Sequence, residues 1–286
     1  MQAVADGRLL WWRTPEAAYL TPVALQGHAW LRCAFTMRQT DSATGGFNLS
    51  YDRGLRHAVS RHRAALLKAL DLEGSTLHTV RQVHGNRVYV VDAAALQNSR
   101  AGVEADALIT TLPGAALGVL AADCLPIVLY ALHTPLVALV HAGRMGTFHL
   151  VTRAAIGAIK RQFGVAPGQL HALLGPAIGA CCYDLDDHAV RPFQERFPDW
   201  QLFIKPNERH RDTARPWTMS LTAANEGQLL AAGVPPTQLG IVSPCTQCHR
   251  EYFYSHRAEG AKAGRGMAVI GIRPSGEPPH PGDSGK

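Results

Sequence analysis

Two histidines and one cysteine lie at the ends of short apolar segments that are far apart in the chain. His84 lies in the segment QVHG, Cys124 in ADCLP and His141 in VHAG. Two imidazoles and one thiolate form a ligand set that suits zinc, and catalytic zinc sites keep a fourth position open for water or substrate. The sequence therefore predicts a zinc enzyme, provided that the fold brings these three side chains together.

Each of these residues also has a more ordinary interpretation. A single histidine is usually a hydrogen-bonded structural or surface residue, and a single buried cysteine usually fills space in the core. Two carboxylates accompany the set, because Asp123 precedes Cys124 and Asp106 lies in the segment EADA. Either carboxylate could orient a ligating imidazole or act as an acid or base, and a capped turn or a structural ion pair is the alternative.

The other cysteines show no recognisable metal motif. The segment CTQCH at 245–249 matches the pattern of c-type haem attachment, but the N-terminal residues lack the pattern of an export signal. The same C-x-x-C could supply half of a structural zinc site, but no second pair has suitable spacing. Cys181 and Cys182 are adjacent, and neighbouring side chains point apart in a strand. We therefore expect no second metal site.

Composition and charge favour small anionic ligands. The chain has 286 residues, with 28 Lys and Arg against 22 Asp and Glu and a net charge of +6. This excess suits phosphate esters, and a solvated basic surface is the alternative. Arg257 and Arg265 lie near glycines, where a planar guanidinium could bind phosphate or simply face solvent. The chain has no Lys/Arg run, so we expect no nucleic-acid partner.

Neither a membrane span nor a disulfide scaffold is expected. Residues 115–140 form a long apolar stretch, but Asp123, His133 and Pro135 interrupt it, and two buried strands fit better than one spanning helix. Six cysteines in a chain of this length, without a signal-peptide pattern, indicate a reducing compartment. We expect a cytoplasmic protein that is a monomer or a dimer.

The hydrophobic patterns indicate one domain that contains both helices and strands. Residues 1–273 show no internal repeat and no clear linker, and the Pro/Gly-rich residues 274–286 are expected to be a disordered tail. Thr147 is expected to cap a helix and Gly164 to end it. We expect helices at 53–70, 147–163, 187–197 and 221–232. We expect strands at 9–12, 30–35, 76–83, 87–91, 107–110, 117–121, 135–141, 171–178, 239–242 and 267–272.

Several short motifs between about residue 45 and residue 272 follow one another in the order of a known family. The chain resembles the laccase-domain family, also called the peptidoglycan editing factor family. Members of that family are described as zinc-dependent purine nucleoside phosphorylases and were earlier described as multicopper polyphenol oxidases. The motifs that carry the resemblance are GFNL at 46–49, QVHG at 82–85, ADA at 105–107, ADCLP at 122–126, HAG at 141–143, LGPAIG at 174–179, CCY at 181–183 and FYSHR at 253–257.

This resemblance implies an α+β fold in one domain, with mixed β-sheets in an α/β/β/α sandwich. It implies that His84, Cys124 and His141 bind Zn²⁺, and that the partners are purine nucleosides and phosphate. The implied reactions are phosphorolysis of adenosine, inosine, guanosine or methylthioadenosine, and deamination of adenosine. The expected catalytic residues are Asp123, Cys124 and Arg257, and the expected substrate-binding residues are Asn48, Arg144, Ser255 and Arg265.

The sequence departs from the family pattern beside the third ligand. The family usually has His-Ala-Gly-Trp-Arg-Gly, whereas this chain has Arg144 at the Trp position and Met145 at the Arg position. A binding or editing protein with a vestigial pocket is therefore one alternative function. A copper-dependent polyphenol oxidase, with Cu²⁺ in place of Zn²⁺, is the other. Multicopper oxidases need many more histidines than one His₂Cys set, and the chain has no His-x-His pair, which argues against that chemistry.

Overall fold

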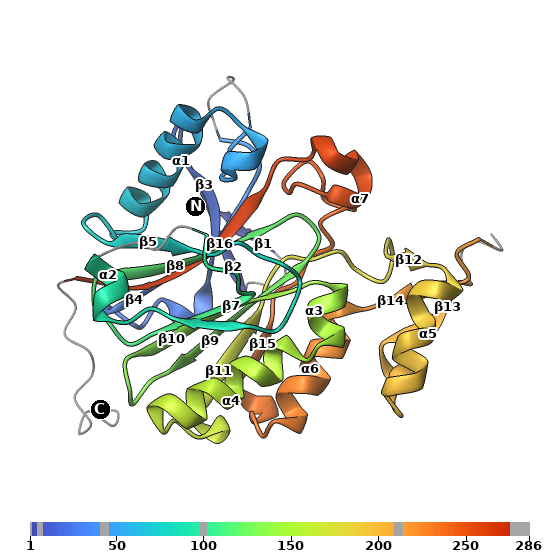
Figure 1. The fold of residues 1–286 in the computed structure, drawn as a ribbon. Helices are drawn as coiled ribbons and strands as arrows, with labels where there is room; N and C mark the ends of the chain where they lie inside the picture. The colour runs from blue at the N-terminus through green and yellow to red at the C-terminus, as the bar shows by residue number, and fades with distance from the viewer. Residues whose placement is uncertain (1, 5–7, 41–45, 98–101, 209–213, 275–286) are drawn as a thin grey trace.

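Two β-sheets face each other in the computed structural model, and helices cover the outer face of each sheet (Figure 1). Clusters of buried side chains fill the spaces between the four layers. The α+β class and the α/β/β/α arrangement expected from the sequence are therefore confirmed. The expected tail at 274–286 lies, apart from its first residue, outside the described residues. The structure describes residues 2–4, 8–40, 46–97, 102–208 and 214–274.

The first sheet has seven strands, and helix α1 covers its outer face. Helix α1 spans Arg56–Ala69 and buries Leu66 in a cluster with Ala34 and Val269 of the sheet. The order of the strands places the C-terminal strand β16 between β4 and β8. From one edge to the other, the strands are β1 Gln2–Val4, β2 Leu9–Arg13, β3 Ala18–Pro22, β4 Leu31–Thr36, β16 Gly266–Ile272, β8 Ala115–Ala121 and β5 Thr76–Thr79.

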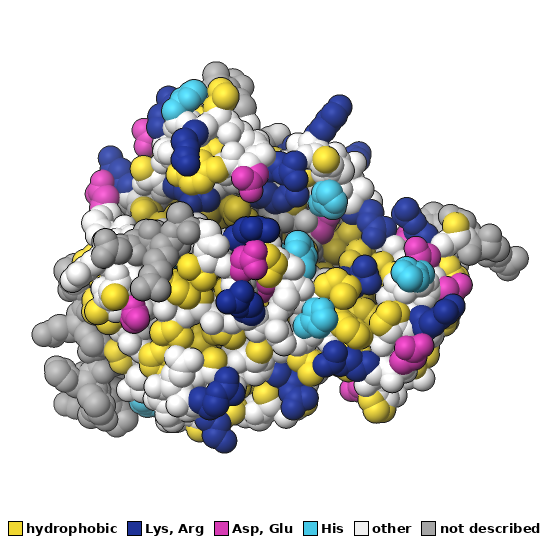
Figure 2. Space-filling model, viewed as in Figure 1, with side chains coloured by type: hydrophobic (Ala, Val, Ile, Leu, Met, Phe, Trp, Pro, Cys, Tyr) yellow, Lys and Arg dark blue, Asp and Glu magenta, His cyan; other side chains and the backbone are white. Residues whose placement is uncertain are grey.

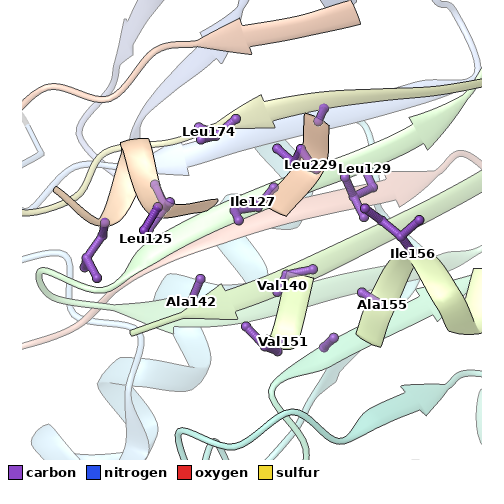
Figure 3. Packing of buried hydrophobic residues seen from close by; sticks show 14 of the residues in the cluster. Leu125, Ile127, Leu129, Val140, Ala142, Val151, Ala155, Ile156, Leu174 and Leu229 are labelled. Atoms are coloured by element: carbon purple, nitrogen blue, oxygen red, sulfur yellow. The ribbon is translucent and has the colours of Figure 1, made fainter. Parts of the chain in front are cut away.

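The second sheet has six strands, and helices α4 and α6 cover its outer face. In Figure 3, Val151 and Ala155 of α4 lie beside Val140 and Ala142 of the sheet, and all four side chains are fully buried. Helix α4 spans Val151–Phe163 and helix α6 spans Leu221–Ala231. From one edge to the other, the strands are β15 Leu239–Ile241, β11 Leu170–Leu174, β9 Leu125–Ala131, β10 Leu136–Ala142, β7 Ala107–Thr110 and β6 Val88–Val90.

The long apolar stretch at 115–140 forms the centre of this sandwich. Every residue of β9 and β10 is buried, because one face of each strand meets the other sheet and the opposite face meets α4 and α6. The sequence predicts two buried strands here, and the structure has three, since the part before His133 forms both β8 and β9, and β9 was not among the expected strands. Within the described part of the chain, no helix combines the length and the apolar character that a membrane crossing requires.

The helix expected at 147–163 is interrupted. Leu150 adopts a left-handed conformation with φ of 62°, which separates a short helix α3, Arg144–Phe148, from α4. The prediction that Thr147 caps the long helix is wrong, because its buried hydroxyl accepts a hydrogen bond from Asn225 Nδ2 at 2.9 Å. Gly164 ends α4 in a left-handed conformation, as the sequence predicts.

A small three-stranded sheet lies next to α5 and was not expected. Its strands have two or three residues each, which is too few for a hydrophobic period to show. The helix expected at 187–197 is confirmed as α5, Asp187–Arg196, and the Asp186 side chain accepts from the Ala189 amide at its start. The remaining elements are β12 Asp184–Leu185, β14 Trp217–Met219, β13 Ile204–Pro206, α2 Ala93–Gln97 and α7 His256–Glu259.

Candidate metal centre

The strand register brings Cys124 and His141 to the same end of two neighbouring strands in the six-stranded sheet. Strands β9 and β10 are antiparallel, with Ala142 opposite Leu125. Cys124 precedes β9 by one residue, and His141 is the second-last residue of β10. The start of one strand and the end of its antiparallel neighbour lie at the same end of the sheet. The two side chains therefore meet although 17 positions separate them in the sequence.

Two more strands start at this end of the sheet and bring Asp106 and His84 to it. Strand β7 runs antiparallel to β10, with Ala107 opposite Val140, so Asp106 lies beside His141. Strand β6 runs parallel to β7, with Val88 opposite Ala107, so the turn that precedes β6 lies beside Asp106. That turn carries His84. Four strands therefore deliver three side chains that could bind a metal, and one carboxylate, to one place.

We call His84, Cys124 and His141 the strand-end cluster. Their ligating atoms all lie within 4.8 Å of one another, and Cys124 Sγ is 3.9 Å from His84 Nε2. His141 is buried, Cys124 is partly buried and His84 is exposed. These distances suit one metal ion between the three side chains, and the exposed side leaves room for a fourth ligand from solution.

Asp106 organises the cluster from behind. Its fully buried carboxylate accepts hydrogen bonds from the backbone amides of Val83, His84 and Gly85 at 3.2, 2.9 and 2.8 Å. The same carboxylate bonds His141 Nδ1 at 2.9 Å, so that Nε2 is the ring atom that could bind a metal. Burial raises the pKa of Asp106, but the His141 and backbone hydrogen bonds outweigh burial and lower it. The hydrogen bond to His141 fits the orienting role that the sequence suggests for Asp106.

The backbone is unusual at this end of the sheet. His84 and Asp123 adopt left-handed conformations with φ of 58° and 89°, which cost on the order of 1–3 kcal/mol each and persist only where the surroundings enforce them. Gly143 follows β10, and a Cβ there would come within 2.8 Å of Cys124 Sγ and 3.0 Å of His84 Cδ2. A glycine is therefore needed for Cys124 and His84 to come this close to the backbone at position 143.

The electrostatics favour a thiolate at Cys124. Burial raises the pKa of the Cys124 thiol, but the neighbouring His141 and His84 imidazoles outweigh burial and lower it to about 6. Burial lowers the pKa of His141, but Cys124 and Asp106 outweigh burial and raise it to about 9. Without a metal, the two groups therefore form a thiolate–imidazolium pair at neutral pH. The thiolate is the form of cysteine that binds metals.

A cleft of about 270 Å³ opens beside the strand-end cluster. The Arg257 guanidinium donates to the Asp184 carbonyl at 2.9 Å and lies over the Tyr183 ring. Arg144 Nη1 points to the Ala189 carbonyl at 3.4 Å. Figure 2 shows histidine and basic side chains on this face, between the part that carries α7 and the part that carries α3 and α6. Besides the cluster residues His84 and Cys124, the cleft is lined by Ala122, Asp123, Arg144, Met145, Ile178, Tyr183, Leu221, His256 and Arg257.

Asp123 joins three segments at the floor of this cleft. Its Oδ1 accepts from Thr246 Oγ1 and its Oδ2 accepts from the Arg257 amide, both at 2.6 Å. Its own carbonyl accepts from the Ile178 amide at 2.9 Å. The side chain is buried, and a carboxylate with about four lone-pair positions can still accept a further hydrogen bond.

The other expected substrate-binding residues lie behind the wall of the cleft. Asn48 Oδ1 accepts from the Arg265 amide at 2.9 Å, and Arg265 Nη1 donates to the Ala263 carbonyl at 2.7 Å. Ser255 is fully buried and caps α7, where its Oγ accepts from the Ala258 amide at 3.3 Å. None of the three lines the cleft as the structure describes it. Ser255 holds the start of α7, which carries His256 and Arg257, whereas Asn48 and Arg265 hold the segment at 263–265.

Sequence reasoning missed two parts of the site. Tyr183 and His256 line the cleft, and only their place in the motifs CCY and FYSHR pointed to them. The expectation of no second metal site overlooked a group of four cysteines whose sulfur atoms all lie within 4.8 Å of one another. We call this group the turn cluster. It consists of Cys181, Cys182, Cys245 and Cys248.

Comparisons with known proteins agree with this architecture. A family model described as multi-copper polyphenol oxidoreductase laccase matches residues 32–273. The chain belongs to this family. The resemblance inferred from the motifs is thereby confirmed, and the family match includes all three residues of the strand-end cluster and all four of the turn cluster.

Several relatives of this laccase-like family carry enzymatic names. A purine nucleoside phosphorylase named YlmD, from Geobacillus stearothermophilus, is 30% identical over 268 residues and covers 87% of this chain and 96% of its own length. An adenosine deaminase named RL5, from an unknown prokaryotic organism, is 32% identical over 228 residues, which cover 77% of this chain and 83% of the relative.

Solved structures share the fold. The crystal structure of YlmD from Geobacillus stearothermophilus superimposes with a TM-score of 0.78 at 28% identity, over 93% of this chain and 99% of that one. A hypothetical protein named YfiH, from Bacillus licheniformis, gives a TM-score of 0.79 at 26% identity, over 90% of this chain and 97% of that one. The similarity to named enzymes indicates an enzymatic role, related to that of purine nucleoside phosphorylases.

Proposed function

We propose that this protein is a zinc-dependent purine nucleoside phosphorylase that also deaminates adenosine. The observation that supports the proposal is that His84, Cys124 and His141 converge beside a cleft whose wall carries Arg144 and Arg257. A metal ligand set with an open side suits activation of water or of a substrate group, and guanidinium groups suit phosphate. When bound, zinc supplies Lewis acidity at the open side of the cluster.

Phosphorolysis needs an anion to be held against the ribose, and we assign that task to the two cleft arginines. Arg257 is directed by the Asp184 carbonyl and the Tyr183 ring, and Arg144 is directed toward the Ala189 carbonyl. A guanidinium has five N–H donors, so these contacts orient each side chain and leave donors for a phosphate. Holding the phosphate next to the nucleoside in this way lowers the entropy cost of bringing two free reactants together. Arg265 would support this site through its charge, behind the cleft wall.

Proton transfer needs groups that hold or release a proton at the purine. We assign Asp123 as the carboxylate that moves the proton in deamination, because it lies next to Cys124 and borders the cleft. The phenol of Tyr183 borders the same cleft. Burial and the Cys124 charge raise the pKa of Tyr183, while Arg144 and Arg257 oppose the rise. Tyr183 is therefore protonated at neutral pH and can donate a hydrogen bond to the leaving base.

The test is turnover of adenosine by zinc-loaded protein, with and without phosphate. Phosphorolysis converts adenosine and phosphate to adenine and ribose 1-phosphate, and deamination converts adenosine and water to inosine and ammonia. We expect both base and inosine to appear with phosphate, and inosine alone without it. If neither product forms from adenosine, inosine, guanosine or methylthioadenosine, the proposal is wrong and a binding or editing role takes its place.

The family description favours a second candidate, a copper-dependent polyphenol oxidase. A His₂Cys set can bind copper, and blue copper sites use such a set with a weak axial ligand. Metal analysis of protein purified without added metal separates the two candidates. Abundant copper with a blue absorption band and oxidation of phenols would favour the oxidase, and zinc with nucleoside turnover would favour the phosphorylase.

A further inference from the structure

The turn cluster lies where two turns that are distant in the sequence come together. Cys181 and Cys182 lie in one turn, and Cys245 and Cys248 lie in the other. Cys248 Sγ is 3.5 Å from the sulfur atoms of both Cys181 and Cys182, and all four sulfur atoms lie within 4.8 Å of one another. An isolated backbone bridge between Ala177 and Cys245 joins the two segments.

We propose that the turn cluster binds a second zinc ion, which is structural and has four thiolate ligands. Zinc–sulfur bonds of about 2.3 Å in a tetrahedron place the sulfur atoms about 3.8 Å apart, and the observed separations of 3.5 Å and below 4.8 Å bracket that value. A disulfide would need two sulfur atoms about 2.05 Å apart. Four protein ligands close the coordination sphere, so this site offers no position for a substrate.

The local backbone explains how adjacent cysteines reach one ion. The amides of Cys182 and Tyr183 both donate to the Gly179 carbonyl, at 2.9 and 3.0 Å, so this segment is a tight turn. Side chains that alternate in a strand can converge in a turn, which removes the objection drawn from their adjacency. In the second segment the His249 amide donates to the Cys245 carbonyl at 3.0 Å. This turn directs the sulfur atoms of Cys245 and Cys248 toward those of Cys181 and Cys182.

A backbone donor and a glycine complete the site. The Gly179 amide donates to Cys245 Sγ at 3.2 Å, and hydrogen bonds to a thiolate favour its charged form. A Cβ at Gly179 would lie 3.1 Å from Cys181 Sγ and 3.2 Å from Cys245 Cβ. The glycine therefore lets the backbone approach the sulfur atoms closely, as Gly143 does at the strand-end cluster.

The second ion would tie a segment that lines the cleft to a segment that holds the cleft residue Asp123. The residue after Cys245 is Thr246, which bonds the Asp123 carboxylate, and the residue after Cys182 is Tyr183, which lines the cleft. Structural zinc stabilises a fold by linking segments that the unfolded chain separates. We therefore assign the turn cluster to stability and to the positioning of these segments. This inference does not depend on the proposed reaction.

The decisive measurement is the zinc content of reduced protein purified without added metal. We expect two zinc ions per chain in the natural protein. We expect one in the double variant Cys181→Ser/Cys248→Ser, one in Cys124→Ser, and two in Cys33→Ala. Cys181 and Cys248 are exposed, so serine there disturbs little packing, whereas Cys33 is a buried cysteine outside both clusters. The loss of one zinc ion in Cys181→Ser/Cys248→Ser, relative to the natural protein, carries the test, and it holds whichever metal the strand-end cluster binds. A double variant that retains all the zinc of the natural protein would overturn the proposal.

Cobalt substitution tests the ligand type without any variant. A tetrathiolate site loaded with cobalt gives intense sulfur-to-cobalt charge-transfer absorption, whereas the strand-end cluster has only one sulfur ligand. We expect the intensity to exceed that of a one-thiolate site several-fold, and to fall to that level in the double variant. A spectrum with the intensity of one thiolate in the natural protein, or a non-reduced mass that shows a disulfide among these four cysteines and no metal, would contradict the second site.

Discussion

The strand-end cluster and the turn cluster both contain cysteine, but the elements that hold them differ. The ends of β6, β7, β9 and β10 hold the first, and their register leaves little freedom to its three side chains. Two turns hold the second, and each turn is closed by only a few backbone hydrogen bonds. The ends of paired strands can keep three side chains in place without a metal, whereas the proposed ion would link the two turns to each other.

The clusters also differ in what surrounds them. Three ligands, an exposed side and a cleft with arginines allow the strand-end cluster to meet a substrate. Four ligands leave the turn cluster closed to substrates. The comparison therefore teaches that the number of ligands, more than the presence of cysteine, separates a site for chemistry from a site for stability.

The largest effect is expected from Cys124→Ser. Losing a direct ligand should lower nucleoside turnover more than about 100-fold, beyond the 10–100-fold cost of losing an outer partner, and should remove one zinc per chain. The double variant Cys181→Ser/Cys248→Ser is the matched comparison. It should lower the unfolding temperature more than Cys124→Ser and lower turnover far less. Equal losses of turnover in the two variants would erase the distinction between the clusters.

Asp106→Asn should have the next largest effect and should act on the strand-end cluster alone. An amide oxygen cannot accept all the hydrogen bonds that the carboxylate accepts from His141 and the backbone amides at 83–85. We expect a loss of zinc affinity of about 10–100-fold and a fall in the free energy of unfolding of about 1.5–3 kcal/mol.

The measurements are zinc competition with a chelator and denaturant unfolding. Asp92→Asn is the control, because Asp92 also accepts a backbone hydrogen bond, from Ala95, but lies at the start of α2. If Asp106→Asn released the second zinc ion instead of the first, the assignment of Asp106 to the strand-end cluster would be wrong.

Met145→Arg tests whether the open cluster lacks an anion contact. Met145 is 37% exposed and lines the cleft. A guanidinium there should speed phosphorolysis by roughly one to two orders of magnitude, since a charge-assisted hydrogen bond contributes about 1.5–3 kcal/mol. Deamination needs no phosphate and should change less. Product ratios at several phosphate concentrations give the answer.

Arg144→Ala tests the alternative that Arg144, at the neighbouring position, already binds the phosphate. If Arg144 already supplies the phosphate contact, this variant should raise the apparent KM for phosphate and Met145→Arg should change little. If the apparent KM for phosphate changes in neither variant, we would assign the phosphate contact to Arg257 instead.

Zinc binding at the strand-end cluster should weaken as the pH falls. Protons compete with the metal, because zinc binds the thiolate and neutral imidazoles. The raised pKa of His141, about 9, means that one proton must leave this ring at neutral pH, and below the Cys124 pKa of about 6 a second proton must leave. Affinity should fall about tenfold per pH unit for each displaced proton.

Chelator competition between pH 5 and pH 8 should therefore show a slope that steepens below about pH 6. Asp106→Asn removes one of the two groups that raise the pKa of His141, so it should flatten the upper part of this profile. A slope near zero over the whole range would mean that the thiolate–imidazolium pair is absent.

The helices with long periodic patterns could be predicted from the sequence, and so could the strands β8, β10 and β16, whereas β9 was missed. Helices α5 and α6 begin at the expected residues, because a buried face repeats over about three turns and polar caps mark the starts. The small sheet of β12, β13 and β14 and the break at Leu150 could not be predicted. Strands of two or three residues carry no period, and a left-handed leucine is held by its surroundings alone.

The chemical types at the strand-end cluster could be identified from the sequence, because histidine and cysteine residues beside glycine and proline at strand ends are visible in a linear chain. Tertiary structure alone decided which strand ends lie together, since register depends on pairings between distant segments. It also decided that two adjacent cysteines meet a C-x-x-C across 63 positions. Sequence motifs for metal sites describe ligands that lie within one local turn. They contain no information about two separate turns that the fold brings together.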